Sequence, residues 1–398
     1  MARTPVFGTA ASFSITAATF ALVTTGGTLP TPLYTVWEKE FGFDPEITTW
    51  IFSTYVLGTL IALIFFGALS DQIGRKPLVI AALFTAIAST VFFVFAANTP
   101  MLLIGRLLSG FSVGLITSPA TAALVELYRG ANKAFPAMVS TAVNMGGLGL
   151  GPLLAGLFAQ YLPDPAQLVF VFYLVLVVVA TVLAVFVPET IARRATTVDW
   201  TPRVGVPRSA LGVYWRSALA VFPTFALLGV FASLSPQFIG GTLHIHNLLV
   251  GGLATFIVFE IGVVAQLAFR SRAPRWSILL GLILLVVALG FVLAGLLAAS
   301  VGLFAAGTVV GGFGAGLAFM GGLGQLGRAV PVESRAKSIA AYFIAAQSGL
   351  AVPVLAIGAL DEPLGLNPAA SLVIVIIIAL AVVAWIANLR RPATVTSH

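Results

Sequence analysis

Long apolar runs separated by short polar connections dominate this chain of 398 residues. A helix needs about 20 apolar residues to cross the hydrocarbon core of a bilayer, whereas helices of soluble proteins average about 11–12 residues. The runs fall near residues 13–36, 48–70, 77–97, 101–125, 134–161, 168–187, 217–240, 248–269, 276–298, 302–326, 337–360 and 369–389. This pattern predicts an all-α membrane protein with twelve transmembrane helices.

The most polar of the connections divides the chain in two. Residues 191–216 form the longest connection and carry five arginines. We interpret them as a cytoplasmic linker between two six-helix bundles, residues 1–190 and residues 217–398. Short sequences recur between the two halves in the same order, at a nearly constant separation of about 200 residues, as expected for an internal repeat. The pairs are TPLYT from Thr31 and SPQFI from Ser235, GFSVGL from Gly110 and GFGAGL from Gly312, and GPLLAG from Gly151 and VPVLAIG from Val352.

Composition supports a membrane protein and excludes several other classes. Hydrophobic residues make up 59% of the chain and charged residues only 8%, whereas soluble proteins carry about 25% charged residues. The net charge of +7 does not indicate nucleic-acid binding, because the basic residues lie in short connections between apolar runs. The chain has no cysteine, which excludes disulfides and thiolate metal sites. The nearby histidines His244 and His246 have no adjacent carboxylate, so we expect no metal site.

The basic residues also predict the orientation in the membrane. With the N-terminus in the cytoplasm, 18 of the 20 Lys and Arg residues lie on the cytoplasmic side, Lys39 lies outside and Arg106 lies within the membrane. Basic residues in short loops resist translocation and thereby fix orientation. We therefore expect a multi-pass protein of the cell (inner) membrane with both termini in the cytoplasm.

The loop between the second and third runs carries the most specific motif. The sequence GALSDQIGRK, which begins at Gly67, resembles the G-x-L-x-D-x-x-G-R-K signature of the major facilitator superfamily. The resemblance extends over the whole chain and implies a major facilitator fold with two pseudo-symmetric six-helix halves. It also implies a cytoplasmic gate latch of Asp71, Arg75 and Glu126, with Gly67 allowing close helix approach and Gly74 a turn closed to larger residues. Alternatively, the basic residues of this loop only fix the orientation.

The fifth run resembles a second motif of the superfamily. GLGLGPLLAG contains Gly147, Gly151, Pro152 and Gly156, and is similar to the G-x-x-x-G-P-x-x-x-G core that marks proton-coupled exporters. The longer form of that motif has a further glycine where this chain has Met138. Small residues four positions apart form a flat helix face and the proline bends the helix. Ordinary close packing in a glycine-rich bundle is the alternative interpretation.

Two charged residues fall within the predicted spans. Arg106 begins RLLSGFSVG, which resembles a superfamily motif linked to proton transfer. Its position near the outer end of its helix also allows its side chain to extend to the interface. Glu260 is the one acid deep in a span, and an ionised carboxylate is costly there, so it is a candidate for carrying a proton. The alternative for Glu260 is a protonated acid bonded between helices with no role in transport.

Uncharged polar and aromatic residues could line a central cavity, although most such residues serve only in packing. The candidates are Trp50, Tyr55, Asn144, Gln237, Tyr342 and Gln347.

These features favour a secondary active transporter, expected to be a proton-coupled exporter of small, largely hydrophobic compounds by alternating access. Export or import of a polar metabolite such as a sugar remains an alternative, as does a non-transporting receptor on the same scaffold. The chain contains no nucleotide-binding P-loop and no catalytic motif, so we expect neither an enzyme nor a cofactor. Its expected partners are a small-molecule substrate, protons and the lipid bilayer, and it is expected to be a monomer.

Overall fold

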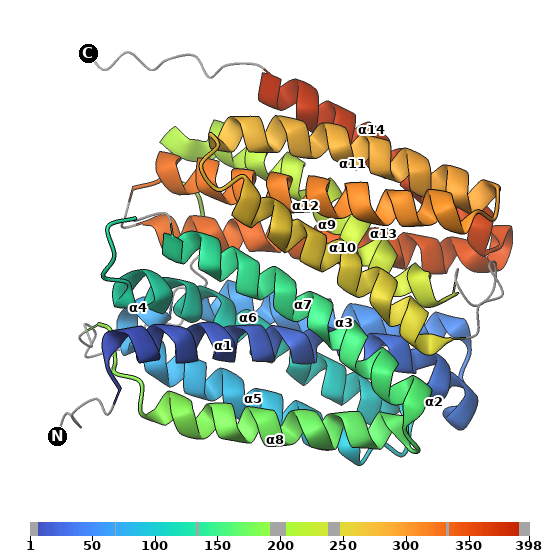
Figure 1. Ribbon diagram of the computed structural model, residues 1–398, viewed down its shortest axis with the longest axis horizontal. Coiled ribbons are helices and arrows are strands. Elements are labelled where there is room, and N and C mark those ends of the chain that lie inside the picture. The colour runs from blue at the N-terminus through green and yellow to red at the C-terminus, as the bar shows by residue number, and fades with distance from the viewer. Residues whose placement is uncertain are drawn as a thin grey trace.

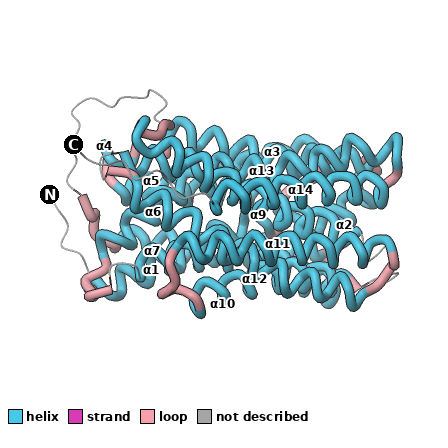
Figure 2. The backbone as a smooth tube through the Cα atoms, turned by 90° about the horizontal axis from the view of Figure 1, so that it is seen from above, coloured by secondary structure: helices cyan, strands magenta, loops and turns pink. Residues whose placement is uncertain are grey.

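The computed structural model describes residues 7–67, 69–132, 135–191, 204–237, 247–331 and 334–389. Over these residues the chain contains 12 helical spans long and apolar enough to cross a membrane, and no strand. The helices run side by side along the long axis of the molecule (Figures 1 and 2). The predicted class and number of spans are therefore confirmed.

The helices form two successive groups. The first comprises α1 (Thr9–Thr28), the 3₁₀ turn η1 (Thr31–Leu33), α2 (Tyr34–Phe41), α3 (Pro45–Phe66), α4 (Ser70–Ile73), α5 (Arg75–Val94), α6 (Thr99–Leu127), α7 (Phe135–Tyr161) and α8 (Pro165–Val185). The second comprises the 3₁₀ turn η2 (Arg208–Ala210), α9 (Leu211–Gln237), α10 (Leu248–Ala268), α11 (Pro274–Leu297), α12 (Val301–Ala329), α13 (Arg335–Leu364) and α14 (Leu366–Leu389). α9 begins inside the predicted linker 191–216, of which residues 192–203 lie outside the described part of the chain.

The first span is interrupted near its C-terminal end. α1 ends at Thr28, and the chain passes through η1 before α2 begins at Tyr34. Pro30 and Pro32 have no N–H to donate and their rings crowd the preceding turn, so an α-helix does not continue regularly through them. The first predicted span is thus confirmed as one segment, Thr9–Phe41, whose helix is interrupted by this turn.

Equivalent glycines pack equivalent helices in the two halves. A Cβ atom added at Gly110 of α6 would overlap the carbonyl oxygen of Tyr55 in α3. A Cβ atom added at Gly312 of α12 would stand 2.5 Å from the carbonyl oxygen of Val258 in α10. Each glycine therefore lets two backbones approach closely where a side chain would hold them apart. The repeated GFSVGL and GFGAGL sequences thus form the same helix crossing twice.

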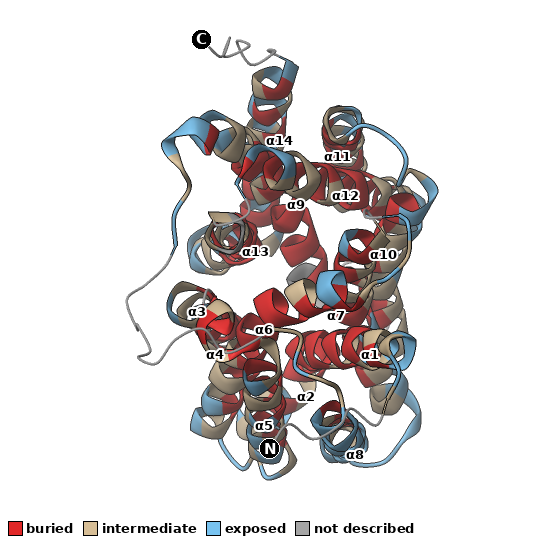
Figure 3. Ribbon diagram, turned by 90° about the vertical axis from the view of Figure 1, so that its left-hand side faces the viewer, coloured by how far each residue is buried: buried red, intermediate tan, exposed pale blue. Residues whose placement is uncertain are grey.

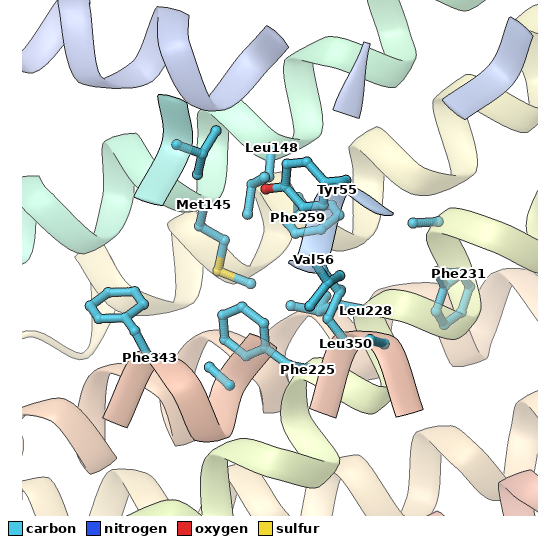
Figure 4. Close-up of a cluster of buried hydrophobic side chains, with 14 of the residues drawn as sticks. Tyr55, Val56, Met145, Leu148, Phe225, Leu228, Phe231, Phe259, Phe343 and Leu350 are labelled. Carbon is cyan, nitrogen blue, oxygen red and sulfur yellow. The ribbon is translucent and has the colours of Figure 1, made fainter. Parts of the chain in front are cut away.

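The two halves meet mainly through two pairs of helices. α7 packs against α10, and α3 packs against α13. The view along the helices shows α1–α8 in one group and α9–α14 in the other (Figure 3). Side chains from both groups fill the contact near mid-height, where Tyr55 and Leu148 of the first half lie near Phe259 of the second (Figure 4). The central contact between the halves is therefore largely apolar.

Candidate functional site: a carboxylate between the halves and an ion cluster in the loop before α5

Glu260 lies where the two halves meet. It is near the middle of α10, and its carboxylate faces α7 at two glycines. A Cβ atom added at Gly149 would stand 2.9 Å from Oε1 of Glu260, and one added at Gly146 would stand 3.4 Å from the same oxygen. The absence of side chains at these two positions thus makes room for the carboxylate at the interface.

The surroundings of Glu260 supply little to stabilise a negative charge. Its Oε1 atom is buried and makes no hydrogen bond to any residue that the structure describes. Glycine offers no side-chain donor, and Phe259 beside it is apolar and buried. A carboxylate in such surroundings is costly when ionised and is a functional candidate by default. The structure places this candidate at the contact between α7 of the first half and α10 of the second.

The glycines of the predicted exporter-like motif divide between two faces of α7. Cβ atoms at Gly147 and Gly151 would overlap the hydroxyl groups of Thr24 and Thr28 in α1. Gly156 instead approaches α10, where its added Cβ would stand 3.2 Å from the carbonyl oxygen of Leu248. Pro152 also borders α10, because a Cβ added at Gly252 would overlap the Pro152 carbonyl oxygen. α7 therefore packs closely on helices of both halves.

Gly146 and Gly149 belong to this site but were not among the predicted residues. They lie one position before and two positions after Gly147, on the part of α7 that faces Glu260. The signal was present in the sequence, since GGLGLG places glycines at several angles around the helix axis. Without the position of α10, however, no rule indicated which of these glycines would face the acid.

Arg106 is enclosed within the first half, and its side chain does not extend to the end of the helix where membrane and water would meet. Its side chain is 0% exposed, and its Nη1 atom donates a hydrogen bond of 2.6 Å to the carbonyl oxygen of Gly27 in α1. Its guanidinium lies 4.8 Å from the ring centre of Tyr55 and 5.6 Å from that of Tyr34, within the range of cation–π attraction. No ion pair joins it to Glu260 among the described residues. The structure therefore does not bring the two predicted proton-coupling residues together, and Arg106 joins α1, α3 and α6.

The predicted latch residues are brought together at the loop before α5. Nη1 of Arg75 lies 2.5 Å from Oδ1 of Asp71, and its Nη2 lies 3.0 Å from Oε1 of Glu126 at the end of α6. Gly74 has φ 109°, a conformation that favours glycine. A Cβ added at Gly67 would stand 3.3 Å from the Cβ of Ala340 in α13. The loop thus carries an ion cluster on one side and lies against the second half on the other.

Glu189 completes this cluster and was not among the predicted residues. Its carboxylate accepts backbone hydrogen bonds of 2.9 Å from Arg75 and 3.0 Å from Lys76, the first residues of α5. A carboxylate at a helix N-terminus satisfies free N–H groups and complements the helix dipole. Thr190, the next residue, donates a hydrogen bond to Glu126. The signal in the sequence was the triplet PET at 188–190, directly after the sixth apolar run, with an acid and a hydroxyl side by side.

A family model described as the Major Facilitator Superfamily matches residues 15–291. That range is more than half of the chain and contains the loop before α5, the glycines of α7 and Glu260. The chain belongs to the major facilitator superfamily. Membership indicates a transporter rather than an enzyme, in agreement with the sequence analysis.

Individual relatives cover shorter parts of this major facilitator protein. An uncharacterised transporter of Rickettsia felis is 32% identical over 97 residues, 24% of each chain. The inner membrane transport protein YnfM of Escherichia coli is 31% identical over 153 residues, 38% of this chain and 36% of that one. The quinolone resistance protein NorA of Staphylococcus aureus is 24% identical over 139 residues, 35% of this chain and 36% of that one. The matches thus span only about a quarter to a third of these relatives.

The fold of the superfamily is matched over nearly the whole chain. The crystal structure of the human organic anion transporter MFSD10 (TETRAN) aligns with a TM-score of 0.74, covering 96% of this chain and 99% of that one. The sequence identity is 16%, so this likeness establishes the fold alone.

The six predicted cavity residues of this major facilitator protein have different surroundings. Tyr55 of α3 is buried beside Gln347 of α13, on one of the two interfaces between the halves. Asn144 of α7 is buried as well. The hydroxyl of Tyr342 donates a hydrogen bond of 3.0 Å to the carbonyl oxygen of Phe319, which holds it within the second half.

The two remaining cavity candidates are not among the buried residues described above. Trp50 is 55% exposed near the start of α3, and the side chain of Gln237 lies outside the described part of the structure. Among the described residues no group of three His, Cys, Asp or Glu side chains could hold a metal ion. His244 and His246 are not among the residues that the structure describes.

Proposed function

We propose that this chain is a proton-coupled exporter of small, largely hydrophobic compounds that works by alternating access. The observation that carries the proposal is the position of Glu260, a carboxylate set against glycines of the other half with Oε1 buried and without a described hydrogen-bond partner. A titratable group at a moving interface changes its surroundings as the halves rock. Proton binding and conformation are thereby linked.

Alternating access would act on Glu260 through the α7–α10 contact. In the described arrangement the carboxylate is pressed against Gly146 and Gly149. Separation of α7 from α10 would admit water to the carboxylate, and a hydrated carboxylate releases a proton more readily than a buried one. Closure would require the proton again. The acid therefore supplies the negative coupling between proton and cargo that exchange requires.

We infer the nature of the cargo from the apolar contact between the halves. The central contact contains Leu148, Phe225, Phe259 and Leu350 (Figure 4), all buried. The quinolone resistance protein NorA resembles this chain in sequence, and the organic anion transporter MFSD10 resembles it in fold. Both names refer to organic molecules of modest size, which supports an organic rather than an inorganic cargo. A receptor on the same scaffold would not transport cargo, and a proton-coupled importer of a sugar would move its cargo in the same direction as the protons.

The expected result in proteoliposomes is accumulation of cargo driven by a pH gradient. A compound that raises the apparent melting temperature of the purified protein would first be chosen from a panel that includes fluorescent quinolones, because specific ligands stabilise the folded state by mass action. With an acidic lumen and a neutral bath, protons leaving the lumen should drive this compound inward. Accumulation should disappear when an ionophore collapses the gradient. Equal uptake with and without the gradient would contradict antiport, and protein-free liposomes control for passive trapping.

We further propose that both chain termini and the linker face the cytoplasm, on the strength of the basic residues at that end. Because the chain has no cysteine, single cysteines can be introduced without background. Gly205→Cys, before α9, should be labelled by an impermeant maleimide only in inside-out vesicles. Ala299→Cys, between α11 and α12, should be labelled in intact cells. The reverse pattern would invert the proposed topology.

A further inference from the structure

A basic cavity opens at the terminal end of the second half, far from Glu260. It has a volume of about 420 Å³ and lies among α9, α11, α12 and α14. These four helices lie together at the end from which Figure 3 is viewed. The described residues that line it are Val213, Arg216, Ala273, Pro274, Arg275, Gln325, Arg328, Ala329 and Asn388. Three of these are arginines, and none of the described lining residues is acidic.

The cavity wall is fixed by hydrogen bonds between helices. Nε and Nη2 of Arg275 donate to the carbonyl oxygens of Asn388 and Leu389 at the end of α14, at 3.2 and 2.6 Å. Nδ2 of Asn388 in turn donates to the carbonyl oxygen of Arg216, at 3.2 Å. Arg275 and Asn388 are thereby held in place. These hydrogen bonds join α9, α11 and α14, three of the four helices around the cavity.

Arg328 supplies an available positive charge at the rim. It lies in the last turn of α12 and is exposed. It forms no ion pair with any carboxylate of the described residues. The guanidinium group has five N–H donors in a fixed planar arrangement that matches the oxygens of a phosphate group. A cavity with three such groups and no acid among its described residues favours an anionic ligand with phosphate oxygens.

Exposed tryptophans place this cavity at the level of lipid headgroups. Trp215 precedes Arg216 and is 60% exposed, and Trp276 follows Arg275 and is 37% exposed. Tryptophan is enriched where a membrane protein crosses from hydrocarbon to water. Each tryptophan is therefore expected beside the headgroups, with its neighbouring arginine at the same depth. This depth favours a phosphate carried by a lipid over one in solution.

We propose that this cavity binds the phosphodiester headgroup of an anionic phospholipid. Basic pockets between transmembrane helices are suited to such headgroups. The lipid belongs to the leaflet at the terminal end of the helices, which is the cytoplasmic leaflet under the proposed topology. A soluble phosphate ester offers the same anion, so the experiment must distinguish the two sources.

The test is a titration of the purified protein in detergent with phosphatidylglycerol. The quantity measured is the shift in the apparent melting temperature of the protein. Phosphatidylglycerol should stabilise the protein, whereas zwitterionic phosphatidylcholine at the same mole fraction should not. Arg328→Gln should weaken the apparent affinity for phosphatidylglycerol roughly fivefold, as expected for the loss of one interfacial arginine. Arg328→Lys, which keeps the charge, should retain most of the binding.

The matched control is Arg270→Gln, which removes an exposed arginine of the α10–α11 loop that does not line the cavity. It should bind phosphatidylglycerol like the unmodified protein. Equal affinities for Arg328→Gln and Arg270→Gln would overturn the site. Stabilisation by millimolar glycerol phosphate equal to that by the lipid, and lost in Arg328→Gln, would assign the cavity to a soluble ester and overturn the lipid proposal.

Discussion

Replacing Glu260 by glutamine is expected to abolish accumulation of cargo driven by a pH gradient, a loss of at least about tenfold, since one titratable group suffices for the coupling. Counterflow of cargo down its own gradient should persist, because the amide imitates the protonated acid in size and shape. The glycines at Gly146 and Gly149 leave the same space for an amide as for the acid. The measurement is transport in proteoliposomes with and without the imposed gradient.

A suitable control for this variant is Glu362→Gln, which removes an exposed acid near the end of α13. Its transport should match that of the unmodified protein. If Glu260→Gln still accumulates cargo against its gradient, the coupling group lies elsewhere, with Glu126 and Asp71 as the remaining candidates. Loss of both accumulation and counterflow, together with a lowered melting temperature, would instead indicate a structural role.

Asp71→Asn is expected to lower transport about tenfold while the protein remains folded. The Asp71 side chain is 45% exposed and shares Arg75 with Glu126. Exposed ion pairs contribute roughly 0–1 kcal/mol to stability, so the melting temperature should change little. The loop lies against α13 through Gly67 and Ala340, so loosening it should shift the balance between the two conformations. A shift of about 1.4 kcal/mol in that balance corresponds to a tenfold change in population.

This second prediction is checked by transport assays together with the rate at which a maleimide labels a single cysteine introduced into the loop before α5. Faster labelling with slower transport would support a gate. Glu40→Gln, an exposed acid near the end of α2, is the control. Unchanged transport by Asp71→Asn would mean that the motif serves only to orient the chain.

The fold could be predicted because the bilayer imposes it. Hydrocarbon admits only segments that satisfy their own backbone hydrogen bonds, so length and apolar composition alone located twelve spans. The interruption after Thr28 could have been predicted from Pro30 and Pro32. The apolar run continues through both prolines, however, so hydropathy alone does not indicate the interruption. At that point the geometry of proline, and not the apolar pattern, determines where the helix ends.

The candidate sites were predictable only in part, because their members are distant in sequence. Asp71 and Arg75 share one motif, whereas Glu189 reaches the same loop from 114 residues away. Glu260 was evident as an acid within an apolar run. Its glycine neighbours depend on the rotation of α7 about its own axis, which the sequence does not reveal. Arg106 could equally have reached the interface, and only the packing of α1, α3 and α6 decided its position.

The internal partners of the first half have a consequence for biosynthesis. The described partners of Arg75 and Arg106 all lie between Gly27 and Glu189, so the first half can supply the partners of these two arginines while the second half is still on the ribosome. Domains generally fold as units, the N-terminal one first during synthesis. Glu260 emerges later, and the α7 surface that receives it is already formed. Insertion of the second half would then dock this acid onto a finished partner, so that assembly of the two halves and formation of the proposed coupling site are a single event.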